Sequence, residues 1–289
     1  MVLVVLVSGL IPYDSGKTWF TLSVALAVKL KGFKPSIYKP IAGHNLWYSP
    51  RTYIKSLELG VLVGNDILAY YEHGLVSSLE RANPIDIATM PPDPLRYPSM
   101  SIYESVFDDI SKLAILSRVH RCKEDSTVHY IHVENLENTT LKNKKLVIKL
   151  ASKLKALPRE FNYLYEYLVS RSVEEDLEAC FKMISEGADV VFVEGFNDAL
   201  TPYLRLLDEA ILLVVVAPSR VLIYRDTNSI RKVVLENTLK HGFEGFRSKH
   251  VVEHFKPDYT VETGLAVRPR PGKPHREFVE KVLAPLLKS

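Results

Sequence analysis

The sequence predicts an α/β protein, a three-layer sandwich built on a mostly parallel sheet, with an inserted region made of a β-hairpin and a helix. Three apolar runs, at Val2–Val7, Val190–Glu194 and Ile211–Ala217, have the length and composition of buried parallel strands. A loop and then a helical pattern follow each run, most clearly at Asp226–Leu239. Strands that alternate with helices form parallel sheets with right-handed crossovers, and such sheets bind ligands beyond the carboxyl ends of their strands.

The loop after the first strand has a glycine at each end. Gly9 ends the strand, and Gly16-Lys17-Thr18 opens an amphipathic helix that continues to about Leu30. A buried strand, a glycine-bounded loop and a helix that begins with Lys-Thr form the context of a phosphate-binding P-loop. Six residues separate Gly9 from Gly16, where the standard P-loop spacing has four. The alternative is an ordinary glycine-rich turn between a strand and a helix.

A P-loop at this place would hold a nucleotide through its backbone and two side chains. Free N–H groups at the start of the helix, together with the helix dipole, favour a polyphosphate. Lys17 would pair with the outer phosphates, and the Thr18 hydroxyl would bind Mg²⁺. We therefore expect ATP or another purine nucleoside triphosphate, together with Mg²⁺, as the cofactors.

Three charged residues outside this loop fall where a parallel sheet binds its ligands. Lys39 follows the second expected strand, Asp66 opens a helix, and Glu194 ends a buried strand as a Walker-B-type acidic residue does. Lys39 would face the transferred phosphoryl group, so Lys17 and Lys39 are the predicted catalytic residues. Thr18, Asp66 and Glu194 would supply oxygen ligands to one Mg²⁺. Each also has a structural interpretation, as a solvated strand end, a helix N-cap or a surface turn residue.

The segments between these residues predict further elements. A second strand is expected at Ser36–Ile41, and helical spacing returns over Thr52–Leu62 and around Ile67–Tyr71. The segment Pro84–Pro98 contains five prolines, which predicts an extended, irregular stretch because proline lacks a backbone N–H group. A closing helix is expected from about His275 to Leu287.

Residues 108–172 do not follow the strand–helix order. Alternation of period two at Leu113–Cys122 and Thr127–Glu134 predicts a β-hairpin, and a helix expected over Leu141–Leu157 would cover one of its faces. We expect this insertion to act as a lid over the nucleotide edge or as a contact between subunits. The rest of the chain would form one nucleotide-binding α/β domain, from residues 1–107 and 173–289.

Composition limits the classes of partner. The chain has 289 residues, of which 47% are hydrophobic, as in an ordinary globular protein. The 37 Lys and Arg residues nearly balance the 34 Asp and Glu residues, and the net charge is only +3. That balance argues against nucleic acid or an anionic membrane as the main partner.

The cysteines and the first residues bear on location. Cys122 and Cys180 are too few for a disulfide framework or a metal site, and this predicts a reducing, cytoplasmic environment. The first apolar run is too short to span a membrane and lacks the basic leader of a signal peptide. The sequence contains no glutamine, which favours a thermophilic source because glutamine is thermolabile.

Several of these motifs together resemble dethiobiotin synthetase and its relatives, the ATP-dependent amidoligases of the cobyrinic acid synthase group. The resemblance covers roughly residues 1–105 and 180–240. The lysine pair with Tyr38-Lys-Pro40 is specific to this branch of P-loop proteins, and Asn65-Asp66 adds support. The resemblance implies a P-loop α/β sandwich, commonly a homodimer, that binds ATP and Mg²⁺ through the lysines, Thr18, Asp66 and Glu194. The implied nucleotide-binding residues are Gly9, Asp14, Ser15, Gly16, Lys17 and Thr18.

The sequence differs from the synthetase where the synthetase contacts its substrate. Ile41-Ala-Gly43-His44 replaces a stretch of short residues with a serine, and Phe196-Asn-Asp198 replaces a glycine-rich loop. We take Gly43, His44 and Asn197 as candidate substrate residues. His44 is a candidate general base or hydrogen-bond donor, and its alternative is a structural or solvated histidine.

Three functions remain as hypotheses. In the first, the chain is an enzyme that transfers the γ-phosphoryl group of a nucleotide to a carboxylate or carbamate, which an amine then attacks. In the second, it is a regulatory module that binds or slowly hydrolyses nucleotide and lacks synthetase activity. In the third, it is a P-loop kinase, a hypothesis that the near-neutral charge disfavours for nucleic-acid substrates.

Overall fold

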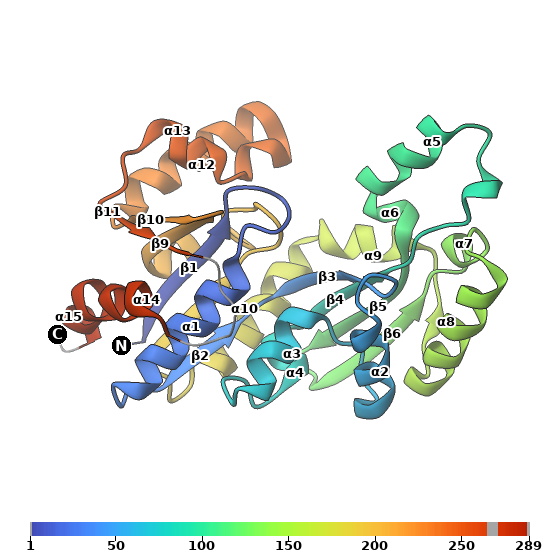
Figure 1. Cartoon of the computed structure of the whole chain (residues 1–289), viewed down its shortest axis with the longest axis horizontal. Helices are drawn as coiled ribbons and strands as arrows, with labels where there is room; N and C mark the ends of the chain where they lie inside the picture. The colour runs from blue at the N-terminus through green and yellow to red at the C-terminus, as the bar shows by residue number, and fades with distance from the viewer. Residues whose placement is uncertain (1, 265–270, 288–289) are drawn as a thin grey trace. The chain divides into compact units, whose positions relative to one another are not determined.

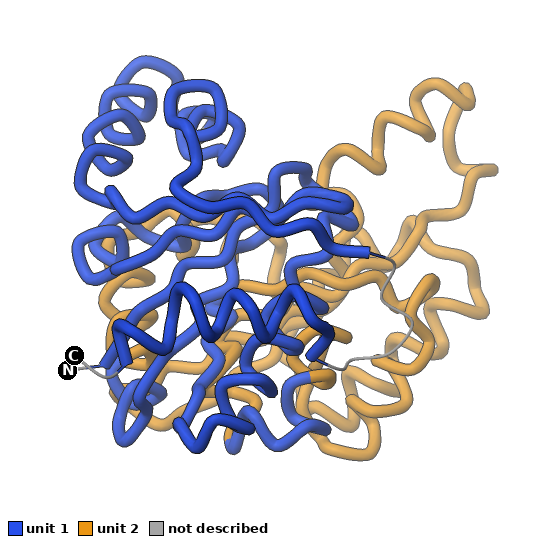
Figure 2. The backbone as a smooth tube through the Cα atoms, turned by 60° about the vertical axis from the view of Figure 1, so that its left-hand side comes forward, with its two compact units in different colours: residues 1–40, 70–77, 182–289 blue, residues 41–69, 78–181 orange. Residues whose placement is uncertain are grey.

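The computed structural model describes residues 2–264 and 271–287, except the side chain of residue 243. The chain is an α/β protein with mixed sheets, an architecture compatible with a three-layer α/β fold (Figure 1). It divides into two compact units, which Figure 2 colours separately. Unit 1 comprises residues 1–40, 70–77 and 182–289, and unit 2 comprises residues 41–69 and 78–181.

The sheet of unit 1 has six strands in the order β11-β10-β9-β1-β8-β2. Four of them are parallel neighbours: β1 (Leu3–Gly9), β2 (Pro35–Tyr38), β8 (Val190–Glu194) and β9 (Ala210–Ala217). Val7 pairs with Glu194 and Gly9 pairs with Val216, so the carboxyl ends of the central strands lie at one edge of this sheet. Two antiparallel strands that the sequence did not predict follow β9: β10 (Arg220–Tyr224) and β11 (Tyr259–Glu262).

Helix α1 (Lys17–Leu30) packs on this sheet against β1, β2 and β8. Its second face is covered by the C-terminal helix α14 (Lys273–Phe278), where the ring centroids of Phe20 and Phe278 lie 5.6 Å apart. Burial on two faces explains the largely apolar sequence of α1. The remaining helical segments of unit 1 are α11 (Leu206–Glu209), α12 (Thr227–His241), η3 (Gly242–Phe246), α13 (Lys249–His254), η4 (Val279–Leu283) and α15 (Ala284–Leu287).

Unit 2 has a mixed five-stranded sheet in the order β3-β4-β5-β6-β7. Its strands are β3 (Ile41–Asn45), β4 (Ile85–Thr89), β5 (Ala114–Arg121), β6 (Ser126–Ile131) and β7 (Leu157–Pro158). Its longer helices are α2 (Pro50–Leu59), α8 (Leu141–Leu154), α9 (Phe161–Leu168) and α10 (Arg171–Ser185), whose last residues enter unit 1. Helix α3 (Asn65–Glu72) also extends from unit 2 into unit 1. The short segments are α4 (Leu79–Ala82), η1 (Pro94–Arg96), α5 (Met100–Ser105), η2 (Val106–Asp108), α6 (Ile110–Leu113) and α7 (Val133–Leu136).

The predicted hairpin is confirmed as β5 and β6, which are antiparallel from Leu116–Ile131 to Arg121–Ser126. The predicted helix is confirmed as α8, whose Val147, Leu150 and Leu154 join the core cluster that contains Ile115 and Leu116 of β5. The strand β5 lies between β4 and β6 and is buried along nearly its whole length. The hairpin is therefore part of the core of unit 2, so removing it would unfold this unit.

Two sequence predictions of local structure are wrong. The strand expected at Ser36–Ile41 ends at Tyr38, and Ile41 begins β3 of the other sheet. The segment Pro84–Pro98 is not irregular throughout, because Ile85–Thr89 forms the fully buried strand β4. All five prolines lie outside those five residues, so the backbone N–H groups of β4 remain available for the sheet.

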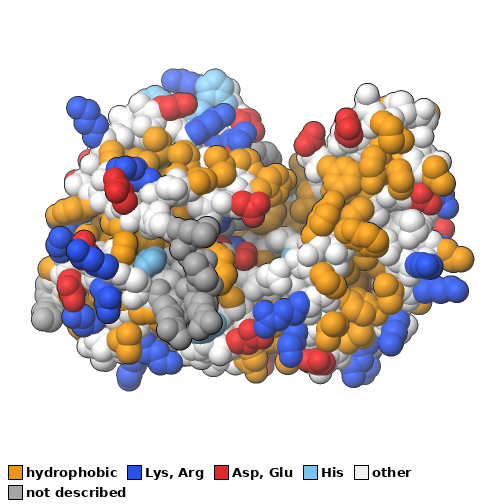
Figure 3. Space-filling view, viewed as in Figure 1, with side chains coloured by type: hydrophobic (Ala, Val, Ile, Leu, Met, Phe, Trp, Pro, Cys, Tyr) orange, Lys and Arg blue, Asp and Glu red, His pale blue; other side chains and the backbone are white. Residues whose placement is uncertain are grey.

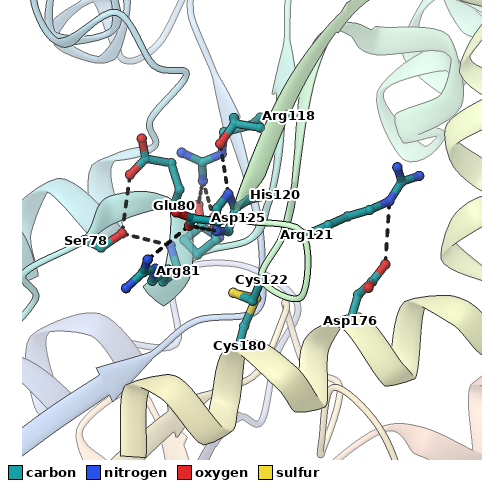
Figure 4. Close-up of a disulfide and its surroundings, with 12 residues drawn as sticks. Ser78, Glu80, Arg81, Arg118, His120, Arg121, Cys122, Asp125, Asp176 and Cys180 are labelled. Atoms are coloured by element: carbon teal, nitrogen blue, oxygen red, sulfur yellow. Dashed lines mark hydrogen bonds and ion pairs between the residues drawn. A yellow bond between two sulfur atoms is a disulfide. The ribbon is translucent and has the colours of Figure 1, made fainter. Parts of the chain in front are cut away.

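The cysteine prediction is also wrong, because Cys122 and Cys180 form a disulfide (Figure 4). Cys122 follows β5 directly and Cys180 lies on α10, with their Cα atoms 5.1 Å apart. The bond joins residues 58 positions apart, a pairing that spacing alone does not reveal. Intracellular proteins of hyperthermophiles are often disulfide-rich, so this bond does not by itself assign an oxidising compartment.

Hydrophobic side chains gather on the face of unit 2 that carries α5 and α8 (Figure 3). Leu95 is 91% exposed, and Met100 and Ile102 of α5 are also exposed, as are Leu141 and Leu146 of α8. This unit therefore presents apolar side chains to solvent, and the expected lid or subunit contact of residues 108–172 stays a prediction. None of the helices in the described residues is long and apolar enough to cross a membrane.

We expect reduction of Cys122–Cys180 to lower the free energy of unfolding of unit 2 by about 4 kcal/mol, because the bond closes a long loop in the unfolded chain. Urea unfolding followed by circular dichroism, with and without reductant, measures this difference. The double variant Cys122→Ser/Cys180→Ser serves as the control that reductant should not affect. Equal unfolding midpoints of the wild type under both conditions would contradict the expectation.

Candidate functional site

The loop between β1 and α1 is bounded by two glycines, one favoured by its backbone conformation and the other by close neighbours. Gly16 precedes α1 with φ at 90°, in the left-handed region. A Cβ atom on Gly9 would lie 2.6 Å from Ser15 Oγ and 2.9 Å from Lys17 Nζ, so these two side chains would have to shift to admit it. Asp14 also has a positive φ, of 52°. The two glycines therefore let the loop fold back closely over the end of β1.

Lys17, the first residue of α1, is buried beneath this loop. Its Nζ donates hydrogen bonds to the backbone carbonyl of Asn197 at 2.7 Å and to Ser15 Oγ at 3.4 Å. The predicted residues Gly9, Ser15 and Lys17 are thus neighbours in space. Asn197 joins them through its carbonyl oxygen, and its assignment as a substrate residue stays a prediction.

Glu194, the last residue of β8, is the centre of the polar contacts in unit 1. Its carboxylate is 0% exposed and accepts hydrogen bonds from Lys39 Nζ at 2.7 Å and from Thr18 Oγ1 at 3.0 Å. The Tyr70 hydroxyl donates to the second carboxylate oxygen. The structure therefore brings together three predicted residues, Thr18, Lys39 and Glu194, at the carboxyl edge of the parallel strands.

The pair of Lys39 and Glu194 is fully desolvated, since the Lys39 side chain is only 5% exposed. Removing one partner of such a pair leaves an uncompensated buried charge, which typically costs about 3–5 kcal/mol. The Thr18 and Tyr70 hydroxyls satisfy further lone pairs of the carboxylate. Together these donors satisfy the carboxylate of Glu194 at a place that is closed to solvent.

The segment that follows Glu194 is fastened by its own contacts. A Cβ atom on Gly195 would lie 2.5 Å from the Ala199 carbonyl, so the tight turn requires glycine. Ser8 Oγ donates to the same carbonyl at 2.8 Å. Arg247 Nε pairs with Asp198 at 2.6 Å, and Ser248 Oγ donates to the Asp198 carbonyl at 3.0 Å. These contacts fix the position of the Asn197 carbonyl against Lys17.

Thr18 and Glu194 fit part of a magnesium site, because both offer hard oxygen atoms and they already lie within hydrogen-bond distance. Within the described residues, no group of three or more His, Cys, Asp and Glu side chains could hold a metal ion. Magnesium bound with a nucleotide does not need such a group, since phosphates and waters complete its shell. Asp66 belongs to unit 2, and its convergence with Thr18 and Glu194 stays a prediction.

Unit 2 contains a polar pocket of about 170 Å³ at the start of α3. The pocket is lined by Ala42, Gly43, His44, Asn45, Ser49, Gly64, Asn65 and Asp66. The predicted residues Gly43, His44 and Asp66 therefore share one pocket. His44 Nδ1 lies 3.2 Å from Asp86 Oδ1, and both side chains are almost completely buried.

A buried polar network continues from this pair through the core of unit 2. The Arg118 guanidinium is fully buried, interacts electrostatically with Asp86, and donates to the Leu62 carbonyl at 2.7 Å and to Asn83 Oδ1 at 2.7 Å. Burial, with the charge of Arg118 as a second cause, lowers the pKa of His129 to about 4, against a smaller opposing effect of Asp86. His129 therefore stays neutral at pH 7, and its Nε2 accepts a hydrogen bond from the Leu62 N–H group.

Sequence reasoning missed Tyr70 and Asp86. Tyr70 lies four residues after Asp66, a spacing that places both on one face of a helix and that could have identified it. Asp86 is an acidic residue inside the apolar run Ile85–Thr89, a signal for a buried, partnered charge. The prolines on either side of this run obscure that signal, because they predict an irregular segment.

No protein-family model and no curated protein matches this sequence.

We expect His129 to make the protein less stable in acid. Its folded pKa of about 4 lies below the unfolded value of about 6.5, so the unfolded chain takes up the proton first as the pH falls. Stability from this group is complete above pH 6.5 and falls by roughly 3 kcal/mol by pH 4. Urea unfolding across this range should show a shallower pH dependence in His129→Gln, whose amide can still accept from Leu62. Parallel curves for the two proteins would contradict the assignment.

Proposed function

We propose that this chain is a Mg²⁺-dependent enzyme that binds a purine nucleoside triphosphate and transfers its γ-phosphoryl group to a carboxylate or carbamate. One observation carries the proposal: the hydrogen bond between Thr18, at the start of α1, and Glu194, at the end of a neighbouring parallel strand. A hydroxyl and a carboxylate at that edge are what a nucleotide-bound magnesium requires. The resemblance to dethiobiotin synthetase supplies the class of reaction and the proposal of a homodimer.

The lysines support the phosphoryl-transfer part of the proposal. Lys17 lies in the glycine-bounded loop with its ammonium group hydrogen-bonded to Ser15 and Asn197, and a triphosphate would replace the neutral carbonyl by charged oxygens. Lys39 adds a second ammonium on the same carboxylate that Thr18 contacts. Two lysines and Mg²⁺ can stabilise the charge that develops on the transferred group.

A trapping experiment tests this function. The purified chain is incubated with ATP or GTP, Mg²⁺ and hydroxylamine, together with panels of carboxylic acids or of amines with bicarbonate. Nucleoside diphosphate that forms only with a particular acid, together with the corresponding hydroxamate, supports carboxylate activation. Diphosphate formation that needs an amine and bicarbonate supports carbamate activation. If no nucleotide binds, the proposal fails.

The second candidate is a regulatory module that binds or slowly hydrolyses nucleotide. The observation that favours it is the segment Phe196–Asp198, which stands where the synthetase has its glycine-rich substrate loop and is held by Arg247 and Ser248. Slow hydrolysis that no acid or amine accelerates would support this function over the enzyme.

We expect Lys17→Ala to weaken triphosphate binding by roughly 30- to 150-fold, because it removes a charge-assisted contact worth about 2–3 kcal/mol. Isothermal titration calorimetry with ATP and GTP in the presence of Mg²⁺ measures the change. Lys29→Ala is the matched control, since Lys29 lies in the last turn of the same helix. Equal affinities of the wild type and Lys17→Ala would contradict the proposed nucleotide site.

Lys39 should act mainly on the transition state, so Lys39→Ala should reduce turnover far more than nucleotide affinity. The change also leaves Glu194 without its buried partner, so unfolding must be measured in parallel. The double variant Lys39→Met/Glu194→Gln removes both charges and should recover stability without recovering turnover. A parallel fall in affinity and turnover would instead make Lys39 a ground-state binding residue.

A further inference from the structure

One face of unit 2 carries opposite charges at its two ends. Segment 97–109, which includes α5 and η2, has three acidic residues and no lysine or arginine. Segment 138–158, which includes α8, has six lysines and no aspartate or glutamate. Figure 1 shows α5 and α8 at opposite ends of this side of the unit, and lysine and arginine side chains gather over the α8 part in Figure 3. The face therefore has an acidic end at α5 and a basic end at α8.

Exposed apolar side chains lie between the two ends. The backbone N–H group of Asp93, just before η1, donates to the Asn138 carbonyl at 2.8 Å, so the chain that leads to α5 lies against the turn that leads to α8. Leu95 and Leu141 follow these two residues and are 91% and 69% exposed. The other large apolar side chains exposed on α5 and α8 are Met100, Ile102, Leu146 and Ile148. An apolar middle thus joins the acidic end to the basic end.

Helix α8 shows that this apolar surface is not a by-product of core packing. Its Val147, Leu150 and Leu154 already join the hydrophobic core of unit 2. Leu146 and Ile148 lie on the outer side of the same helix, and both are 45% exposed. A helix that only covers a core carries polar residues on that side. The outer face of α8 therefore mixes apolar side chains with lysines, which is typical of a surface that binds another macromolecule.

Most charges at the two ends are unpaired within one copy of the chain. Lys144 pairs with Glu137, and Asp109 pairs with Lys112. The other charged residues of the two segments form no ion pair with any residue that the structure describes: Glu104, Asp108, Lys142, Lys145, Lys149, Lys153 and Lys155. Both ends can therefore pair with charges on another molecule.

The partner with complementary chemistry is a second copy of this chain. When two copies meet face to face about a twofold axis, the acidic end of each lies opposite the basic end of the other. Both charge contacts then form in one docking event, and the two apolar middles are buried against each other. An anionic lipid surface would attract the lysines but would repel the acidic end of the same face.

We propose that two copies of this chain pair through this face of unit 2, with α5 of each copy against α8 of the other. This pairing gives the homodimer of the proposed function its contact surface, and it rests on that proposal only for the number of copies. Because the surface lies within unit 2 alone, the pairing can be tested without nucleotide.

A charge exchange between the two ends tests the pairing. The acidic-end variant is Glu104→Lys/Asp108→Lys, and the basic-end variant replaces Lys142, Lys145, Lys149 and Lys153 by Glu. All six side chains are exposed, so both variants should fold, and circular dichroism checks this. In sedimentation velocity over a range of concentrations, each variant alone should dimerise about 100-fold more weakly than the wild type, because like charges then face each other. An equimolar mixture should regain the dimer, since opposite charges meet again at both contacts.

Glu186→Lys/Glu236→Lys is the matched control, because it makes the same change of charge at exposed positions of unit 1 and should leave the dimer intact. High ionic strength should weaken the wild-type dimer by screening the exposed charges. A wild type that is monomeric at low ionic strength, or a mixture that fails to dimerise, would overturn the pairing. The same samples are titrated with ATP and Mg²⁺, so that the nucleotide function is tested separately and a failed mixture counts against the pairing alone.

Leu95→Ser tests the apolar middle. It should weaken the dimer by about tenfold, because pairing buries this side chain in both copies. An unchanged dissociation constant would show that the apolar middles do not meet and would contradict the proposed contact. Vesicles of phosphatidylserine and phosphatidylcholine test the other occupant. A monomeric wild type that binds these vesicles, and a basic-end variant that does not, would assign the face to a lipid surface and overturn the pairing.

Discussion

The buried carboxylate of Glu194 is the constraint on which the polar arrangement of unit 1 depends. An ionised group at 0% exposure is stable only when charged and polar donors surround it. Its donors come from the start of α1, the end of β2 and the end of α3, three places far apart in the sequence. Satisfying one carboxylate therefore orients Thr18, Lys39 and Tyr70 together. Hydrogen bonding to this buried carboxylate, and not contact with solvent, therefore holds the three side chains in place.

Unit 2 solves the same problem with a different set of groups. Arg118 donates hydrogen bonds to carbonyl oxygens and interacts electrostatically with Asp86. The same carboxylate contacts His44 and orients it. Asp86 lies on β4, which pairs with β3 and β5, so strand pairing fixes its position. In both units an acidic residue on a fully buried strand sets the geometry of a basic side chain. Rigid strands are suited to this role because packing holds their side chains in place.

The sequence predicted those elements whose patterns are local. The apolar run ending in Glu194, the alternation around Lys123–Ser126 and the helical spacing of α8 each carry their own periodicity. It did not predict β4, because neighbouring prolines obscured a five-residue strand whose burial depends on partners far away. Two further features also depend on tertiary contacts. The chain changes sheet between Tyr38 and Ile41, and Cys122 pairs with Cys180. Thr18, Lys39 and Glu194 were found because strand ends share one edge of a parallel sheet, whereas Tyr70 contributes from within a helix.

The disulfide turns residues 122–180 into a covalent ring that contains β6, β7 and the helices from α7 to most of α10. The two ends of the ring are the first residue of the β5–β6 turn and a residue just before the chain leaves unit 2. A protease that cuts once inside the ring therefore releases no fragment, because both pieces stay bonded through sulfur. Such a nicked protein would migrate as one species until it is reduced. Proteolytic cuts between residues 122 and 180 can thus occur without any fragment leaving the protein.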